Sequence, residues 1–218
     1  FYGQKLDLDI FKKAGDEGVT LLMSDSTNVE RHEHSMSESG IYDKFEQIFA
    51  AAQGLTIVSM FASNVGRMGQ VLEVARRLGK KVAIAGRSMD QNITLGQSVG
   101  YLKDAQSVLI KSDQIDQFPR NQVIVLSTGS QGEHRSTLIR IARGEHPIIQ
   151  LEPGDLVLMS SKFIPGNEKA IGRMINDLFK QGAEVLHEAI HEIHASGHAT
   201  KPELKRMLEW TRPKFFIP

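Results

Sequence analysis

One stretch of the chain shows the pattern that decides the fold: Val123-Ile124-Val125-Leu126-Ser127-Thr128-Gly129-Ser130-Gln131-Gly132-Glu133. Its apolar, mostly β-branched first half predicts a short buried strand, and a small, polar, glycine-rich turn follows at once. Similar short apolar runs recur at Val19–Met23, Leu55–Phe61, Lys81–Ala85, Val108–Ile110, Leu156–Met159 and Ala183–Leu186. The chain therefore carries a series of short strands.

Stretches with apolar residues at three- and four-residue spacing lie between these runs and predict helices. They are Ile41–Ala51, Val71–Leu78, Leu138–Ala142, Ile171–Phe179 and, with Thr200 as cap and Pro202 in the first turn, Lys201–Trp210. Strands that alternate with helices predict an α/β fold, a doubly wound and mostly parallel sheet with helices on both faces.

Polar turns follow five of the predicted strands, at Ser24–Asn28, Ala62–Asn64, Gly86–Met89, Ser127–Glu133 and Ser160–Glu168. The carboxyl ends of parallel strands form the edge at which α/β sheets bind ligands, and hydroxyls with free backbone N–H groups suit phosphate. Arg67, Arg87, Arg135 and Lys162 lie near these turns. Together they favour a phosphate-rich ligand, although any single turn can serve only to cap a helix.

Composition narrows the class of protein. The 218 residues carry 26 basic and 26 acidic side chains, so nucleic acid would have to bind through local clusters of charge. The absence of cysteine excludes disulfides and thiolate metal sites and fits a reducing compartment, so we expect a cytoplasmic protein. No apolar run approaches the roughly 20 residues of a membrane span.

Histidines gather near the end of the chain and allow two interpretations. His187-Glu188-Ala189-Ile190-His191 matches the H-E-x-x-H pattern of zinc proteases, which requires a helix, whereas the preceding residues read as a strand. His194-Ala195-Ser196-Gly197-His198 reads as a turn that could hold a phosphate or supply a general acid. Its structural alternative is a hydrogen-bonded turn before the last helix.

Asp25 lies at the end of the first apolar run, Val19–Met23, where a carboxylate can ligate a metal ion at the sheet edge. An aspartate before Ser-Thr-Asn is, however, more often a turn or helix-cap residue.

The motifs, taken in order, resemble the ribonuclease J family, which has a metallo-β-lactamase fold and belongs to the β-CASP group. The resemblance rests on Ser24–Asn28, Phe61–Asn64, Gly86–Met89, Thr128–Glu133, Ile164–Glu168, His194–His198 and Pro213–Pro218. It implies that residues 1–28 end a segment of the metallo-β-lactamase core, that 29–193 form the β-CASP domain, and that 194–218 return to the core.

The resemblance also implies roles for individual residues. Asp25 would be a metal-bridging aspartate. Glu38 and His198 would be catalytic, with the acid orienting a histidine and His198 steadying the phosphate. The residues expected to bind substrate phosphate are His194, Ser196, Ser63, Arg87, Ser130, Gly132 and Glu133.

The implied activity of the intact protein is metal-dependent RNA hydrolysis in the 5′→3′ direction, with endonucleolytic cleavage as a second mode. It would use two divalent ions, zinc or manganese, and single-stranded RNA with a 5′-monophosphate. A homo-oligomer or an RNA-degradation complex is a further expectation. The remaining metal motifs, H-x-H-x-D-H and V-H-G-E, would lie before Phe1 and after Pro218, so the chain alone should bind no stable metal pair and be inactive.

This sequence also departs from the family pattern. His134 stands where a proline is usual, and Arg31-His32-Glu33-His34 replaces a stretch with proline and glycine. A non-catalytic module that binds RNA or a protein partner remains an alternative, and a zinc protease remains a weaker one.

Overall fold

The computed structural model describes residues 7–32, 38–102, 105–187 and 197–218. The chain forms two compact units, one made of Gly3–Ser37 with Ala195–Pro218 and the other of Glu38–His194. We call them the terminal unit and the central unit. The domain boundaries expected at residues 28 and 193 stay predictions.

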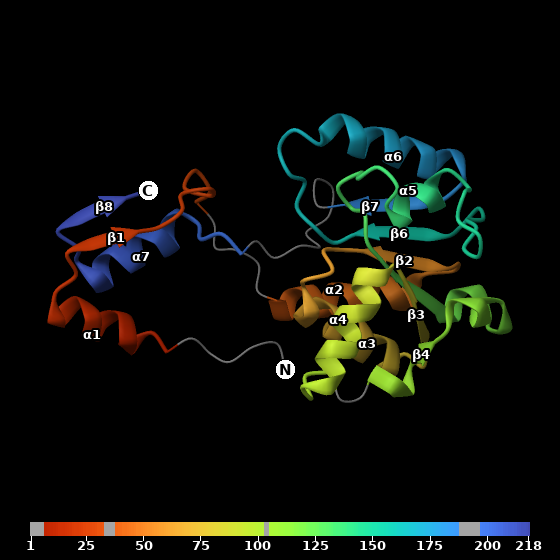
Figure 1. Cartoon of the computed structure of the whole chain (residues 1–218), viewed down its shortest axis with the longest axis horizontal. Coiled ribbons are helices and arrows are strands. Elements are labelled where there is room, and N and C mark those ends of the chain that lie inside the picture. The colour runs from red at the N-terminus through yellow and green to blue at the C-terminus, as the bar shows by residue number, and fades with distance from the viewer. Residues whose placement is uncertain (1–6, 33–37, 103–104, 188–196) are drawn as a thin grey trace. The chain divides into compact units, whose positions relative to one another are not determined.

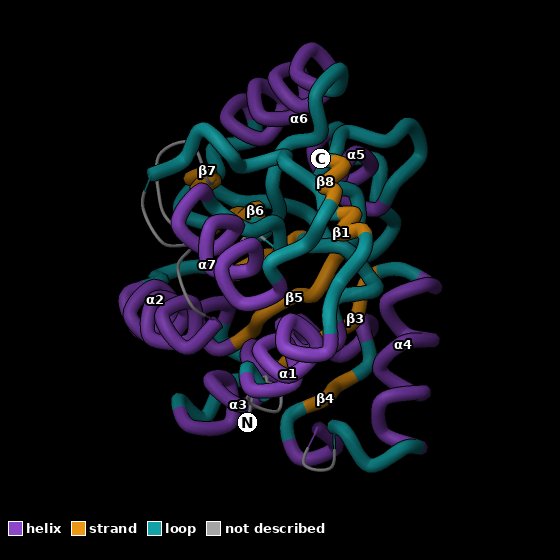
Figure 2. Tube along the Cα trace, turned by 90° about the vertical axis from the view of Figure 1, so that its left-hand side faces the viewer, coloured by secondary structure: helices purple, strands orange, loops and turns teal. Residues whose placement is uncertain are grey.

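The central unit is built on a six-stranded, all-parallel sheet with the order β4-β3-β5-β2-β6-β7. Figure 2 shows β7, β6, β5, β3 and β4 following one another across this sheet. The strands are β2 (Thr56–Ser59), β3 (Lys81–Ala85), β4 (Leu109–Ile110), β5 (Val123–Ser127), β6 (Leu156–Met159) and β7 (Glu184–His187). The predicted α/β class is therefore confirmed, and each predicted strand of this unit is present.

Helices cover both faces of the sheet, with α5 and α6 on one side and α2, α3 and α4 on the other (Figure 1). They are α2 (Glu38–Ala51), α3 (Val65–Arg77), α4 (Arg87–Ser98), α5 (Thr137–Ala142) and α6 (Glu168–Lys180). Three short 3-10 segments, Ala105–Ser107, Ser112–Gln117 and Arg120–Gln122, flank β4 and lead into β5. All residues of β2, β5 and β6 are buried because both faces are covered.

The two faces have separate cores. Leu138, Ile171 and Met174 pack with Ile57 and Val125 under α5 and α6. On the other face Phe45 and Phe49 of α2 are fully buried and stack with ring centroids 5.3 Å apart. Each such phenylalanine contributes about 2–3 kcal/mol of transfer free energy.

The connections after β2 and β5 leave to opposite faces of the sheet. From β2 the chain enters α3 and reaches β3, whereas from β5 it enters α5 and reaches β6. The two strands are neighbours, and the residues after them lie at the carboxyl edge. Ligands of open α/β sheets bind outside such a switch point, so the turns after β2 and β5 are the first place to look for a site.

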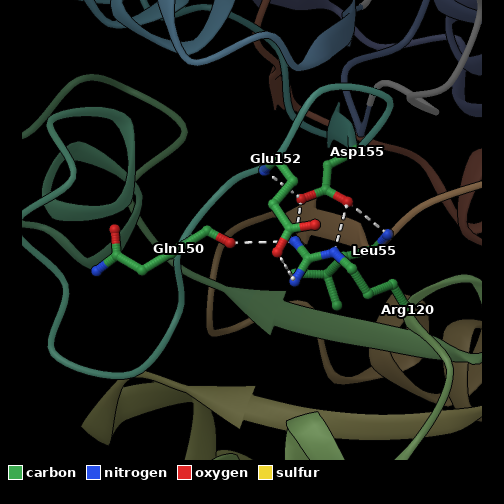
Figure 3. A network of polar contacts seen from close by, with 5 residues as sticks. All are labelled: Leu55, Arg120, Gln150, Glu152 and Asp155. Carbon is green, nitrogen blue, oxygen red and sulfur yellow. Dashed lines mark hydrogen bonds and ion pairs between the residues drawn. The ribbon is translucent and has the colours of Figure 1, made fainter.

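A polar network holds the opposite ends of the central strands (Figure 3). Asp155, just before β6, is 1% exposed and accepts the backbone N–H groups of Leu55, at 2.7 Å, and Glu152, at 2.8 Å. Arg120, before β5, forms an ion pair with Asp155 and donates to the carbonyl of Gln150 at 3.1 Å. One buried carboxylate therefore ties together the starts of β2, β5 and β6.

The terminal unit contains α1 (Asp9–Glu17), β1 (Leu21–Met23), α7 (Lys201–Thr211) and β8 (Phe215–Ile217). β1 and β8 form a parallel two-stranded sheet in which Leu22 pairs with Phe216. α1 packs against α7, and a Cβ at Gly15 would lie 2.0 Å from the carbonyl oxygen of Trp210, so only glycine allows this approach. Thr200 caps α7 and Pro202 lies in its first turn, as the sequence indicated, and the Thr200 backbone N–H and hydroxyl both donate to the Glu203 carboxylate.

In the described part of the chain, none of the helices has the length and apolar character needed to cross a membrane.

Candidate functional site

Two of the predicted site residues, Asp25 and His198, meet in the terminal unit. His198 Nδ1 lies 3.1 Å from Asp25 Oδ1, and both side chains are about half exposed. Asn28 fixes the position of His198 because its side-chain amide donates to the His198 carbonyl at 2.9 Å. Asn28 also forms a β-bridge with Thr200, so the turn after β1 and the start of α7 are joined around the pair.

The Asp25 carboxyl is held in its ionised form. The backbone N–H of Thr27, which donates to Oδ1 at 3.1 Å, contributes most to lowering the pKa of Asp25. Hydrogen bonds with the Thr27 side chain and the His198 ring lower this pKa further, against an opposing effect of desolvation. An exposed, ionised carboxylate beside an imidazole is a chemically suitable ligand for a divalent cation.

These two residues fit part of a metal shell. A zinc or manganese ion needs at least four donors, and a pair of ions needs more. Within the described residues no three histidine, aspartate or glutamate side chains gather into a metal-binding group. The described residues therefore bring together no complete metal shell, and a metal role for Asp25 stays a prediction.

For three of the predicted site residues the structure does not describe the side chain. His194 and Ser196 lie outside the described residues. Glu38 begins α2 in the central unit, and its side chain is likewise outside what the structure describes.

In the central unit, the turns after β5 and β6 are locked together. Ser130 is 1% exposed, and its hydroxyl accepts a hydrogen bond from Ser161 at 2.6 Å. The Gln131 side chain donates to the Lys162 carbonyl at 2.9 Å and accepts from the Ile164 N–H at 2.8 Å. Ser130 therefore stabilises the conformation of the turn after β5. A ligand at this edge of the sheet would contact the exposed residues next to Ser130 before Ser130 itself.

The backbone N–H groups expected to face phosphate are partly engaged. Gly132 N–H donates to the Gly129 carbonyl at 3.2 Å, and Gly166 N–H donates to the carboxylate of Glu168. Gly132 has φ +71°, and a Cβ there would meet the Ala170 backbone at 2.8 Å, so it is needed for packing against α6. Glu133 is exposed and accepts the Gln131 N–H at 3.1 Å.

The two arginines beside the turns have different roles. Arg67 in the first turn of α3 is fully buried, and its guanidinium donates to the Ser160 hydroxyl at 3.1 Å and the Ser160 carbonyl at 3.3 Å. It therefore joins the turns after β2 and β6, whereas the sequence suggests Arg67 as one of the cations near a phosphate-rich ligand. Arg87 is exposed at the start of α4 and remains open to solvent.

Ser63 lies on the rim of a hollow of about 360 Å³ between the start of α3 and α4. Asn92, Leu95 and Tyr101 also line it. Tyr101 is 48% exposed and offers a ring to which a base could stack. The sequence did not indicate this residue because α4 was not predicted; other aromatic residues near the turns are Phe61 and Phe163. Phe163 already stacks on His187 at a centroid distance of 5.5 Å.

The zinc-protease pattern lacks the helix it needs at its first histidine. His187 is the last residue of β7 and pairs in register with Met159 of β6. In a strand, His187 cannot present the one-turn spacing on which H-E-x-x-H chemistry depends. His191 lies outside the described residues.

Comparisons with known proteins agree with this architecture. Residues 53–178 match the family described as ribonuclease J, β-CASP domain. Ribonuclease J of Helicobacter pylori is 40% identical over 215 residues, 98% of this chain. Ribonuclease J of Thermus thermophilus is 42% identical over 206 residues, 94% of this chain, and ribonuclease J 1 of Streptococcus pyogenes is 38% identical over 216 residues, 99% of it.

The chain spans 31%, 36% and 39% of the length of these three relatives, in that order. The resemblance seen in the motifs is therefore confirmed: the chain belongs to the ribonuclease J family, and its central unit contains the β-CASP domain.

Proposed function

We propose that the intact protein is a metal-dependent ribonuclease that degrades single-stranded RNA from a 5′-monophosphate end and also cleaves internally. This chain would supply the domain that holds RNA and one side of the metal site. The observation that carries the proposal is the contact of 3.1 Å between Asp25 and His198 at the end of β1, within a member of the ribonuclease J family.

Asp25 would serve as a metal ligand through its ionised carboxylate. The bound cations would supply an activated water for attack on the phosphodiester. With Asp25 accepting from Nδ1–H, the protonated ring of His198 would donate its Nε2–H to a phosphate oxygen or to the leaving oxygen. Asn28 would keep the ring in place through the His198 carbonyl.

The central unit would guide the RNA strand. Ser63 follows β2 and Arg87 follows β3, the strands on either side of β5, and both residues are exposed, so they remain candidates for phosphate contacts. Glu133 is exposed beside them. Ser130 and Gly132 would act indirectly because they set the shape of the turn after β5.

The terminal unit would be part of the metallo-β-lactamase core. Its two strands expose large apolar side chains, with Met23 71% and Phe215 65% exposed. A two-stranded sheet is marginal by itself, so further strands of the intact protein would complete it.

The test uses the intact protein with Asp25→Asn and His198→Ala, assayed on 5′-phosphorylated and 5′-hydroxyl RNA of one sequence. Both variants should lose about 100-fold or more in metal-dependent hydrolysis while retaining RNA binding. Asp9→Asn is the matched control because Asp9 is an exposed carboxylate of the same unit paired with Lys12.

Undiminished cleavage by Asp25→Asn would refute the proposed metal role. If the wild-type protein bound RNA without cutting it in any divalent metal, the chain would instead belong to a non-catalytic RNA-binding module. Equal rates on the two RNA substrates would remove the 5′-monophosphate preference.

A further inference from the structure

A second hollow of about 440 Å³ lies beside α5 in the central unit. It is lined by His134, Arg135, Ile139, Arg140, Arg143 and Glu145. Three arginines and one glutamate leave two uncompensated positive charges there, in a chain whose basic and acidic residues otherwise balance. Such a local cluster concentrates anions in a way that the whole protein does not.

The arginines are available for a ligand. Within the described residues, no carboxylate or hydrogen-bond acceptor contacts the side chain of Arg135 or Arg143, and both residues are exposed. Arg140 and Arg143 are three positions apart at the end of α5 and therefore lie on one side of it. The Arg140 guanidinium is held by the Glu145 carbonyl at 3.4 Å.

The backbone fixes the entrance to the hollow. Arg135 adopts φ +71°, and the turn around it is closed by the Ser136 N–H, which donates to the Glu133 carbonyl at 2.9 Å. His134 and Arg135 directly continue the polar turn that follows β5. The hollow therefore adjoins the edge along which the proposed function places RNA.

The positive charge of Arg140 affects the pKa of a neighbouring side chain, His146. Burial first, and then the charge of Arg140, lower the pKa of His146. Guanidinium groups present planar sets of N–H donors that match phosphate oxygens, and they stay charged at any physiological pH. The hollow has no phenylalanine, tyrosine or tryptophan among its lining residues, and its arginines suit a sugar–phosphate backbone better than a stacked base.

We propose that this hollow binds the phosphodiester backbone of single-stranded RNA as the strand leaves the turn after β5, with Arg135 and Arg143 as the principal contacts. The proposal rests on the proposed function, since it extends the path of the same RNA. Contacts of this kind are independent of sequence and of the chemical state of the 5′ end.

The test measures binding of a 3′-labelled oligouridylate to the full chain by fluorescence anisotropy at about 50 and 200 mM salt. The double variant Arg135→Ala, Arg143→Ala should bind about tenfold more weakly at the lower salt. Its slope of log Kd against log salt should fall by roughly 1.4, the value for two lost phosphate contacts on a single strand. Both 5′-phosphate and 5′-hydroxyl RNA should be affected equally.

Two further variants serve as controls, one for a general loss of positive charge and one for a loss of the folded structure. Arg173→Ala on α6 removes the same charge from an exposed position outside the hollow and should leave binding within about twofold of wild type. Glu145→Gln removes the only carboxylate of the hollow and should tighten binding about two- to threefold. A gain of affinity cannot come from misfolding.

The outcomes separate the two proposals. If wild type binds RNA and the arginine variants bind equally well, the hollow is not an RNA contact, while the proposed function stands. If wild type binds no RNA, both fail. If oligoglutamate of equal charge displaces the RNA as well as unlabelled oligouridylate does, the hollow suits an acidic protein segment, and the RNA proposal is overturned.

Discussion

The carboxylate of Asp155 accepts the backbone N–H of Leu55 at 2.7 Å, which joins two residues 100 positions apart in the chain. Asp155 also holds Arg120 and the N–H of Glu152, so one side chain satisfies partners from three segments. Truncation of Asp155 would leave the buried N–H of Leu55 without its acceptor and would remove the buried carboxylate that pairs with Arg120.

Asp155→Ala should therefore lower the free energy of unfolding by roughly 2–4 kcal/mol. Urea denaturation followed by circular dichroism measures it. The control is Asp177→Ala, which removes an exposed i,i+3 pair with Lys180 and should cost less than about 0.5 kcal/mol. Equal losses in the two variants would show that the network at the strand starts adds nothing.

Gly132→Ala should destabilise the central unit through backbone strain and a clash. The residue has φ +71°, and the added Cβ would lie 2.8 Å from the Ala170 backbone carbon. Gly166→Ala has the same kind of strain at φ +98° with open space around it. We expect the Gly132 variant to lose about 1–2 kcal/mol more than the Gly166 variant in thermal or urea unfolding. Similar losses would mean that α6 can move aside.

We expect the free energy of unfolding to decrease in acid because His146 becomes protonated. Its Nδ1 accepts the N–H groups of Ile148 at 3.3 Å and Ile149 at 3.0 Å, which requires the neutral ring. Burial and then Arg140 lower its pKa in the folded state. The unfolded chain therefore binds a proton first as the pH falls through about 6.5, and the free energy of unfolding decreases below that pH.

The measurement compares wild type with His146→Asn, which keeps an acceptor but does not titrate. Denaturant titrations between about pH 7.5 and 5.0 should show a smaller decrease for the variant. Parallel curves would assign the acid sensitivity to other groups.

The purified 218-residue chain should not hydrolyse RNA in manganese, magnesium or zinc. Asp25 is the one metal ligand that the family resemblance assigns to it, and one carboxylate cannot hold a pair of cations. A gel assay with labelled 5′-phosphorylated RNA tests this. Cleavage that required metal and disappeared in Asp25→Ala would contradict the expectation.

The strands could be predicted closely because β-branched runs buried on both faces have few other interpretations. Helix α4 was missed because most of Arg87–Ser98 is polar, with only Met89, Ile93 and Gly96 buried. Strand β8 was missed because its partner, β1, lies near the other end of the chain. In each case the missing information was a distant contact.

The candidate site shows the same limit. Turn composition indicated the carboxyl edge, but it could not distinguish an exposed hydroxyl from a buried one. Ser130 is buried because Ser161, from another turn, donates to it. Arg67 is buried because Ser160 accepts its guanidinium. Whether the Asp25–His198 contact acts in hydrolysis stays a prediction.

The position of β2 has a consequence for synthesis on the ribosome. Thr56 pairs with Ile124 on one side and Leu156 on the other, so the central strand emerges long before either neighbour. At about 5–20 residues per second, β6 follows roughly 5–20 seconds later. Until β5 emerges, a strand that is apolar on both faces has no partner, and its second neighbour is absent until β6 follows. Nascent chains arrested before Leu156 should thus be far more sensitive to protease than chains arrested after the sheet is complete, and should depend on a chaperone that shields β2.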